Sequence, residues 1–86
     1  MPPQSKRSVC DMMERAIKFI EQEITAKESR VQDLKERLSK LQSQPNPDPA
    51  QIQEISTDLQ KLEDQLDTDR SQLNAFQEEF AADCGP

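Results

Sequence analysis

The sequence predicts an all-α protein, an antiparallel two-helix coiled-coil hairpin, from three observations. Two long segments carry apolar residues at alternating steps of three and four, the spacing of helices that each bury one stripe. Three prolines, at positions 45, 47 and 49, separate these segments. Two cysteines stand 37 residues before and 37 residues after Pro47, so a chain that folds back at the prolines brings them together.

The first helix is expected over residues 8–43, after a disordered tail at residues 1–7. Ser8 and Asp11 have the spacing of a capping box, in which each side chain bonds the backbone N–H of the other. The helix should end before Pro45, because the residue that precedes a proline is disfavoured in the α region. Its apolar series is interrupted once, by Lys27, and comprises Met13, Ile17, Ile20, Ile24, Val31, Leu34, Leu38 and Leu41.

A turn at residues 44–48 should lead into a second helix at residues 49–83. Asp48 is the expected N-cap, with Gln51 completing a second capping box and Pro49 in the first turn, where its missing N–H is not needed. Gly85–Pro86 is a stop signal, so residues 85–86 form a C-terminal tail or the start of a linker. The second apolar series is interrupted once, by Asp69, and comprises Ile52, Ile55, Leu59, Leu62, Leu66, Leu73, Phe76 and Phe80.

In an antiparallel hairpin each layer of the core pairs one residue of the first helix with one of the second. If the two residue numbers in each layer sum to 93, as for Leu41 and Ile52, every layer contains an apolar residue. Lys27 and Asp69 fall in adjacent layers, and we expect them to form a polar pair that fixes the register at a cost in stability. The alternative is that Lys27 extends to water and Asp69 occupies an open layer. The same register makes neighbours of three further pairs of opposite charge, namely Glu28 with Arg70, Lys35 with Glu63, and Arg37 with Asp58.

The residue numbers of Cys10 and Cys84 sum to 94, close to the 93 of the register, so the two cysteines should meet at the open end of the hairpin. A structural disulfide is therefore expected. A redox switch, reduced thiols and intermolecular links remain as alternatives. The compartment follows from the redox state, because disulfides persist outside the reducing cytoplasm. An extracytoplasmic or other oxidising location is expected if the bond forms. A cytoplasmic one is expected if Met1 is the native start and the thiols stay reduced.

The two apolar series together form the seam between the helices. A second apolar stripe on the first helix, outside this seam, predicts a contact surface. It should bind another protein or a second copy, most simply by pairing two hairpins into a homodimeric four-helix bundle. Scattered surface hydrophobes are the alternative. With the residues of the second helix that face the same side, the surface comprises Val9, Met12, Ala16, Phe19, Ala75 and Ala82.

Composition argues against several kinds of function. The chain has no histidine and one glycine, so neither a catalytic base of that type nor a phosphate-binding loop is present, and we expect no enzyme, cofactor or small-molecule substrate. Two lone cysteines do not make a zinc site, and no loop resembles a calcium-binding EF-hand. The net charge of −6 and the absence of a basic patch disfavour nucleic acid, and no apolar run could span a membrane.

The charge is uneven. Residues 1–43 carry nine basic and seven acidic side chains, whereas residues 44–86 carry two and ten. The acidic second helix is either a solvated face or a site for a basic partner. We therefore expect a non-catalytic protein-interaction, oligomerisation or spacer module. The alternative is a small secreted helical effector or inhibitor that binds a target protein. A helix pair that opens onto lipid fits less well, because a disulfide would oppose opening.

Overall fold

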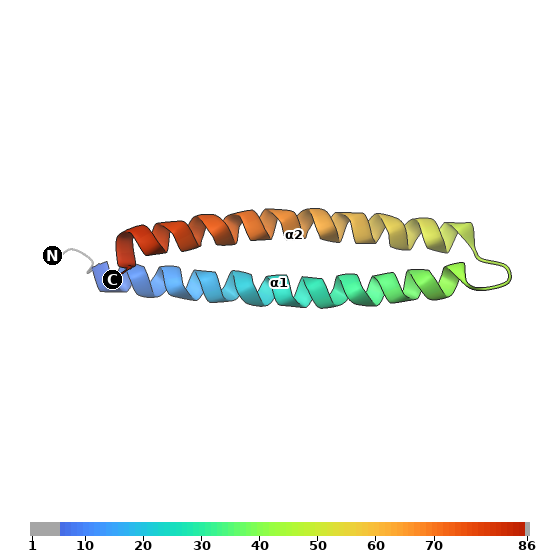
Figure 1. Ribbon diagram of the computed structural model, residues 1–86, viewed down its shortest axis with the longest axis horizontal. Helices are drawn as coiled ribbons and strands as arrows, with labels where there is room; N and C mark the ends of the chain where they lie inside the picture. Colours follow the sequence, from blue (N-terminus) through green and yellow to red (C-terminus); the bar gives the residue numbers. More distant parts are fainter. Residues whose placement is uncertain (1–5, 86) are drawn as a thin grey trace.

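The computed structural model describes residues 6–85, which form two helices and no strand. Helix α1 spans Lys6–Gln42 and helix α2 spans Pro49–Cys84. The helices run antiparallel and side by side along their whole length, with the chain reversing at the prolines (Figure 1). The resulting rod measures 69 × 22 × 16 Å. The predicted helical hairpin is confirmed.

The turn forms as its residue types dictate. At the end of α1 the amide of Ser43 donates to the carbonyl oxygen of Ser39 at 3.1 Å, and the amide of Gln44 donates to that of Leu41 at 3.3 Å. The second bond spans three residues, so the last turn tightens before Pro45. At the start of α2, Asp48 is extended and its Oδ1 accepts a hydrogen bond from the amide of Ala50 at 2.9 Å. This is the expected N-cap.

The outer ends of the helices differ from the sequence expectation. Helix α1 begins at Lys6, so Ser8 lies inside the helix and the expected cap at Ser8 is wrong. Lysine and arginine are good helix formers, and nothing in Lys6 or Arg7 stops the helix from running past Ser8. Residues 6 and 7 therefore belong to the helix and not to the expected tail. The other tail positions, residues 1–5 and Pro86, lie outside the described residues.

Helix α2 ends at Cys84, and Gly85 follows with φ −68° and ψ 160°. This extended conformation is the one favoured before a proline, so a left-handed glycine cap is not what ends the helix. Glycine is nevertheless suited to the position, because a Cβ atom there would collide with the carbonyl oxygen of Ala81.

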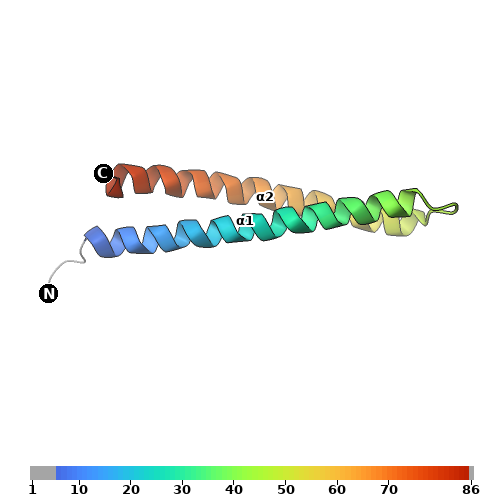
Figure 2. The ribbon, with the colours of Figure 1, turned by 60° about the horizontal axis from the view of Figure 1, so that its bottom comes forward.

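The core is a single seam that is best covered at mid-length. Every seam position predicted from the two apolar series is buried or half-buried, including the positions of Lys27 and Asp69. The helices twist gradually about each other, as Figures 1 and 2 together show. Among the residues whose burial is described, Ile24, Val31, Leu62 and Leu66 are buried, and Ile20, Leu34, Leu59 and Leu73 pack around them. Two helices alone leave the rest of the seam half covered.

Candidate interaction surface

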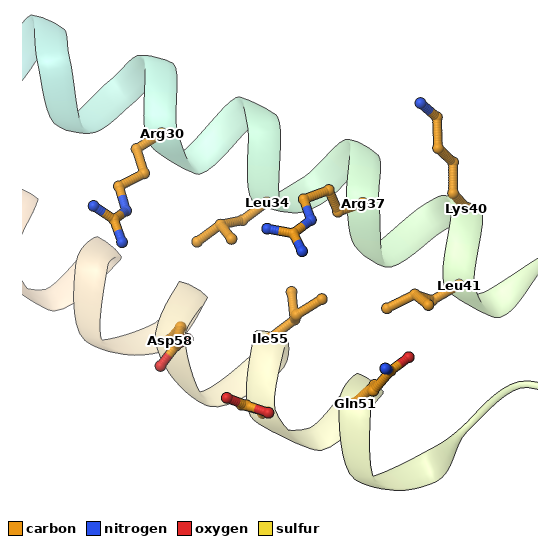
Figure 3. Close-up of a pocket in the computed structure, with 9 residues that line it drawn as sticks. Arg30, Leu34, Arg37, Lys40, Leu41, Gln51, Ile55 and Asp58 are labelled. Carbon is orange, nitrogen blue, oxygen red and sulfur yellow. The ribbon is translucent and has the colours of Figure 1, made fainter.

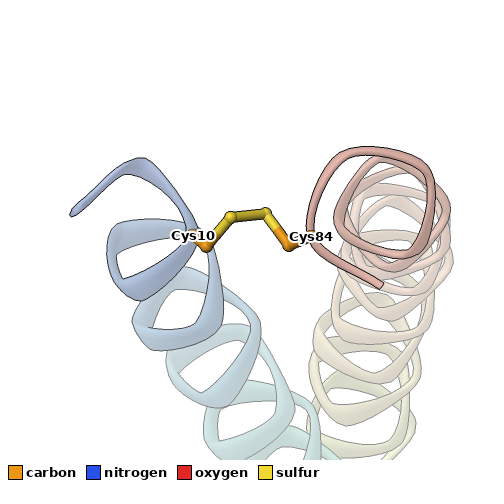
Figure 4. The surroundings of a disulfide bond; sticks show 2 residues. All are labelled: Cys10 and Cys84. Carbon is orange, nitrogen blue, oxygen red and sulfur yellow. A yellow bond between two sulfur atoms is a disulfide. The ribbon is translucent and has the colours of Figure 1, made fainter. Parts of the chain in front are cut away.

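A disulfide closes the open end of the hairpin. Cys10 and Cys84 are bonded, with Cα atoms 5.8 Å apart, and Figure 4 shows the bond bridging the facing sides of the two helices. Neither cysteine is free. The predicted pairing is confirmed. Cross-linking residues 74 apart in sequence stabilises the fold by about 4–5 kcal/mol in the chain-entropy treatment.

A polar pair crosses the seam near mid-length. The Nζ atom of Lys27 donates a hydrogen bond to Oδ2 of Asp69 at 2.5 Å. The two side chains are 25% and 19% exposed, so the pair is only partly screened by water. The structure therefore brings together the two residues that interrupt the apolar series. Their role in fixing the register stays a prediction.

One of the three flanking pairs forms an ion pair. Arg70 contacts Glu28 at 3.4 Å and also Asp67 at 3.8 Å, on a face where about half of each interacting side chain or more is exposed. The other two pairs, Lys35 with Glu63 and Arg37 with Asp58, line shared grooves without forming ion pairs among the described residues. Exposed pairs gain only a few tenths of a kcal/mol, so their side chains are weakly held.

The predicted contact surface lies beside the disulfide and consists of Val9, Met12, Ala16, Phe19, Ala75 and Ala82, here called the apolar patch. Met12 and Phe19 are each 63% exposed and Val9 is 42% exposed. Ala75 and Ala82 are exposed as well. Ala16 differs from the expectation, because it lies next to the seam and is half-buried. Met12 and Phe19 thus present most of their apolar surface to water on one face of the rod.

Toward the turn, the interhelical surface forms a groove with basic side chains on one border and acidic ones on the other, which the sequence did not single out. Arg30, Arg37 and Lys40 of α1 border it, and Glu54 and Asp58 of α2 stand opposite. Figure 3 shows both guanidinium groups directed toward α2, whereas Lys40 extends away from it. The seven-residue step from Arg30 to Arg37 was the signal that could have revealed this face. The groove's apolar floor consists of Leu34, Leu41 and Ile55.

A second interhelical groove, with a polar border, lies at mid-length. Its rim carries Gln32 and Lys35 of α1 and Glu63 and Asp67 of α2, together with the Glu28–Arg70 pair. Among the described residues, the exposed large hydrophobics are Val9, Met12 and Phe19, and none of them lines this groove. The rod therefore has two unlike broad faces, and the apolar patch belongs to only one of them.

Within residues 6–85 there is no cluster of three or more histidine, cysteine or acidic residues that could hold a metal ion. Neither described helix carries a stretch long and apolar enough to cross a bilayer. No protein-family model matches this chain, and neither a curated protein nor a solved structure matches it. What can be inferred about function therefore comes from the chain's own residues.

Proposed function

We propose that this chain is a non-catalytic interaction module, a disulfide-closed rod that self-associates or binds another protein and serves as an oligomerisation or spacer segment. The observation that carries the proposal is the exposure of Phe19 and Met12, each 63% accessible to solvent. The part of a large apolar side chain that stays in water gains nothing from the folding of the hairpin itself. When such side chains cluster on one face, they mark a contact surface.

The setting of the apolar patch supports the same proposal. Its residues stand on two long helices that a disulfide joins within one turn of Val9 and Ala82. A surface held on rigid elements loses little conformational freedom when it binds. The half-covered seam beneath the patch also favours association, because a second helical layer would remove Met13, Ile17 and Phe76 further from water.

Sedimentation of the oxidised protein tests the proposal. We expect a dimer that dissociates on dilution, and we expect Phe19→Asp to give a helical monomer, because the change places a charge within the apolar patch. Gln32→Asp is the matched control, since it adds the same charge to α1 beside the other groove and should leave the dimer intact. A parent protein that stays monomeric at high concentration, or a Phe19→Asp variant that dimerises like the parent, would contradict self-association.

A second candidate is a small secreted effector or inhibitor, and the disulfide is the observation that favours it. Disulfides of this kind persist in oxidising compartments and often stabilise small secreted domains. Alkylation of free thiols at the moment of cell lysis distinguishes the cases. Protein recovered from its native source with Cys10 and Cys84 protected from alkylation supports secretion. Full alkylation of both thiols contradicts it.

A further inference from the structure

Two rows of exposed residues repeat every seven positions beside the seam. In α1 the row is Met12, Phe19, Ala26, Asp33 and Lys40, and in α2 it is Glu54, Lys61, Thr68, Ala75 and Ala82, here called the outer rows. Lys40 and Glu54 line one groove and Ala26 and Lys61 line the next. Both outer rows therefore border the same broad face, which is the face of the apolar patch.

The disulfide determines which members of the outer rows lie level with each other. Cys10 and Cys84, whose numbers sum to 94, have Cα atoms 5.8 Å apart. Antiparallel helices advance by the same rise per residue, so other pairs that sum to 94 also lie at equal height. Phe19 is therefore level with Ala75, and Met12 is level with Ala82.

We propose that this face binds a second copy of the chain in a parallel arrangement, with both disulfide ends together. The proposal rests on the self-association proposed above and gives it an orientation. A two-fold axis along the rod places α1 of one hairpin against α2 of the other without changing the height of any residue. The level members of the outer rows then become contacts between the two hairpins.

Within the outer rows, the two residues that meet at each level are complementary. The five pairs are Met12 with Ala82, Phe19 with Ala75, Ala26 with Thr68, Asp33 with Lys61, and Lys40 with Glu54. Bulky residues meet alanines at two levels, two small residues meet at the third, and opposite charges meet at the last two. An inverted dimer, with the two-fold axis across the rod, would place α1 on α1 and the large apolar residues against the charged half of the partner.

The charges of the outer rows are available for such contacts. None of the four charged members takes part in an ion pair among the residues that the structure describes. Lys40 extends away from α2 of its own hairpin (Figure 3). The broad face spans 69 Å by 22 Å. Its area is therefore larger than the roughly 800 Å² per partner that a stable interface buries.

Two variants with exchanged charges test the orientation at constant net charge. The first carries Asp33→Lys and Lys40→Glu, and the second carries Glu54→Lys and Lys61→Asp. In a parallel dimer each variant meets its own copy with like charges at four contacts. The mixed dimer restores four opposite-charge contacts. Repulsion within one hairpin is the same in both kinds of dimer and cancels.

Native mass spectrometry of the annealed mixture measures the ratio of mixed to unmixed dimers, because the variants differ in mass. A single surface ion pair is weak, but four contacts per dimer change from repulsive to attractive on mixing. We therefore expect the equilibrium constant for forming mixed dimers from unmixed ones to exceed its value for random mixing about a hundredfold. The chain with all four changes should dimerise like the parent. A dimeric parent whose variants mix at random would overturn the orientation and leave self-association standing. A monomeric parent would overturn both.

A photo-cross-link supplies a second measurement that leaves all charges in place. p-Benzoylphenylalanine replaces Phe19 in one chain, the partner chain is the ¹⁵N-labelled parent, and only cross-links between unlabelled and labelled peptides are counted, so cross-links within one hairpin are excluded. Attachment to the partner around Ala75 supports the parallel dimer. Attachment to the partner's α1 overturns it.

Discussion

Breaking the disulfide should destabilise the hairpin strongly, and the structure gives the magnitude. Cys10 and Cys84 close a loop with a sequence separation of 74 residues, which corresponds to about 4–5 kcal/mol of lost chain entropy in the unfolded state. In a domain of this length 1 kcal/mol shifts the melting temperature by about 4–8 °C. Reduction should therefore lower the melting temperature by about 20–30 °C. Circular dichroism at 222 nm, followed on heating with and without a phosphine reductant, measures the shift.

Protein concentration is kept constant in this assay, because association stabilises the folded state by mass action. The double variant Cys10→Ser, Cys84→Ser is the control, and it should melt like the reduced parent in both conditions. A shift of less than about 5 °C would refute the reasoning. It would mean that the seam alone holds the two helices together, or that the reduced chain keeps its ends close when unfolded.

Two further predictions concern the seam. Replacing both Lys27 and Asp69 by leucine should raise the free energy of unfolding by about 1 kcal/mol. Lys27→Leu alone should lower it by about 1–2 kcal/mol, because Asp69 then stays half-buried without a partner. Thermal melts in which the double variant is less stable than the single one would contradict this. Leu66→Ala should cost about 2–5 kcal/mol in urea unfolding, since Leu66 is only 3% exposed. Leu41→Ala, at a half-buried position, should cost less, and equal losses would show that the core is not concentrated at mid-length.

The seam was predictable because each layer of a two-helix hairpin uses one residue from each helix, so the spacing of apolar residues determines which positions are covered. The cysteines were predictable for the same reason, since Cys10 and Cys84 fall into a register defined by other residues. Lys27 and Asp69 followed from being the two polar members of the series. Each of these inferences depends on which side chains the two helices bury against each other, and burying an apolar side chain changes the free energy of folding by about 1.5–3 kcal/mol.

The parts that differed depend on small energies. The start of α1 at Lys6 and not Ser8 reflects nearly equal helix propensities over the first residues. Arg37 and Asp58 form no ion pair among the described residues, because an exposed pair gains too little to hold two long side chains in one geometry. Ala16 is half-buried, whereas Met12 and Phe19 of the same patch are exposed, so a stripe defined by sequence spacing alone does not determine how deeply each member is covered.

The disulfide and the apolar patch are connected through the position of Cys10. Val9 precedes Cys10, Met12 follows it within one turn, and Ala82 lies two residues before Cys84, so the bond holds both halves of the patch at a fixed separation. In the proposed parallel dimer this fixed separation aligns Met12 of one hairpin with Ala82 of the other. Reduction should therefore weaken dimerisation even at temperatures where the helices remain folded, because the patch loses its alignment before the mid-length core is lost. Sedimentation of the reduced protein at low temperature measures this effect, and an unchanged dissociation constant would place the contact elsewhere on the rod.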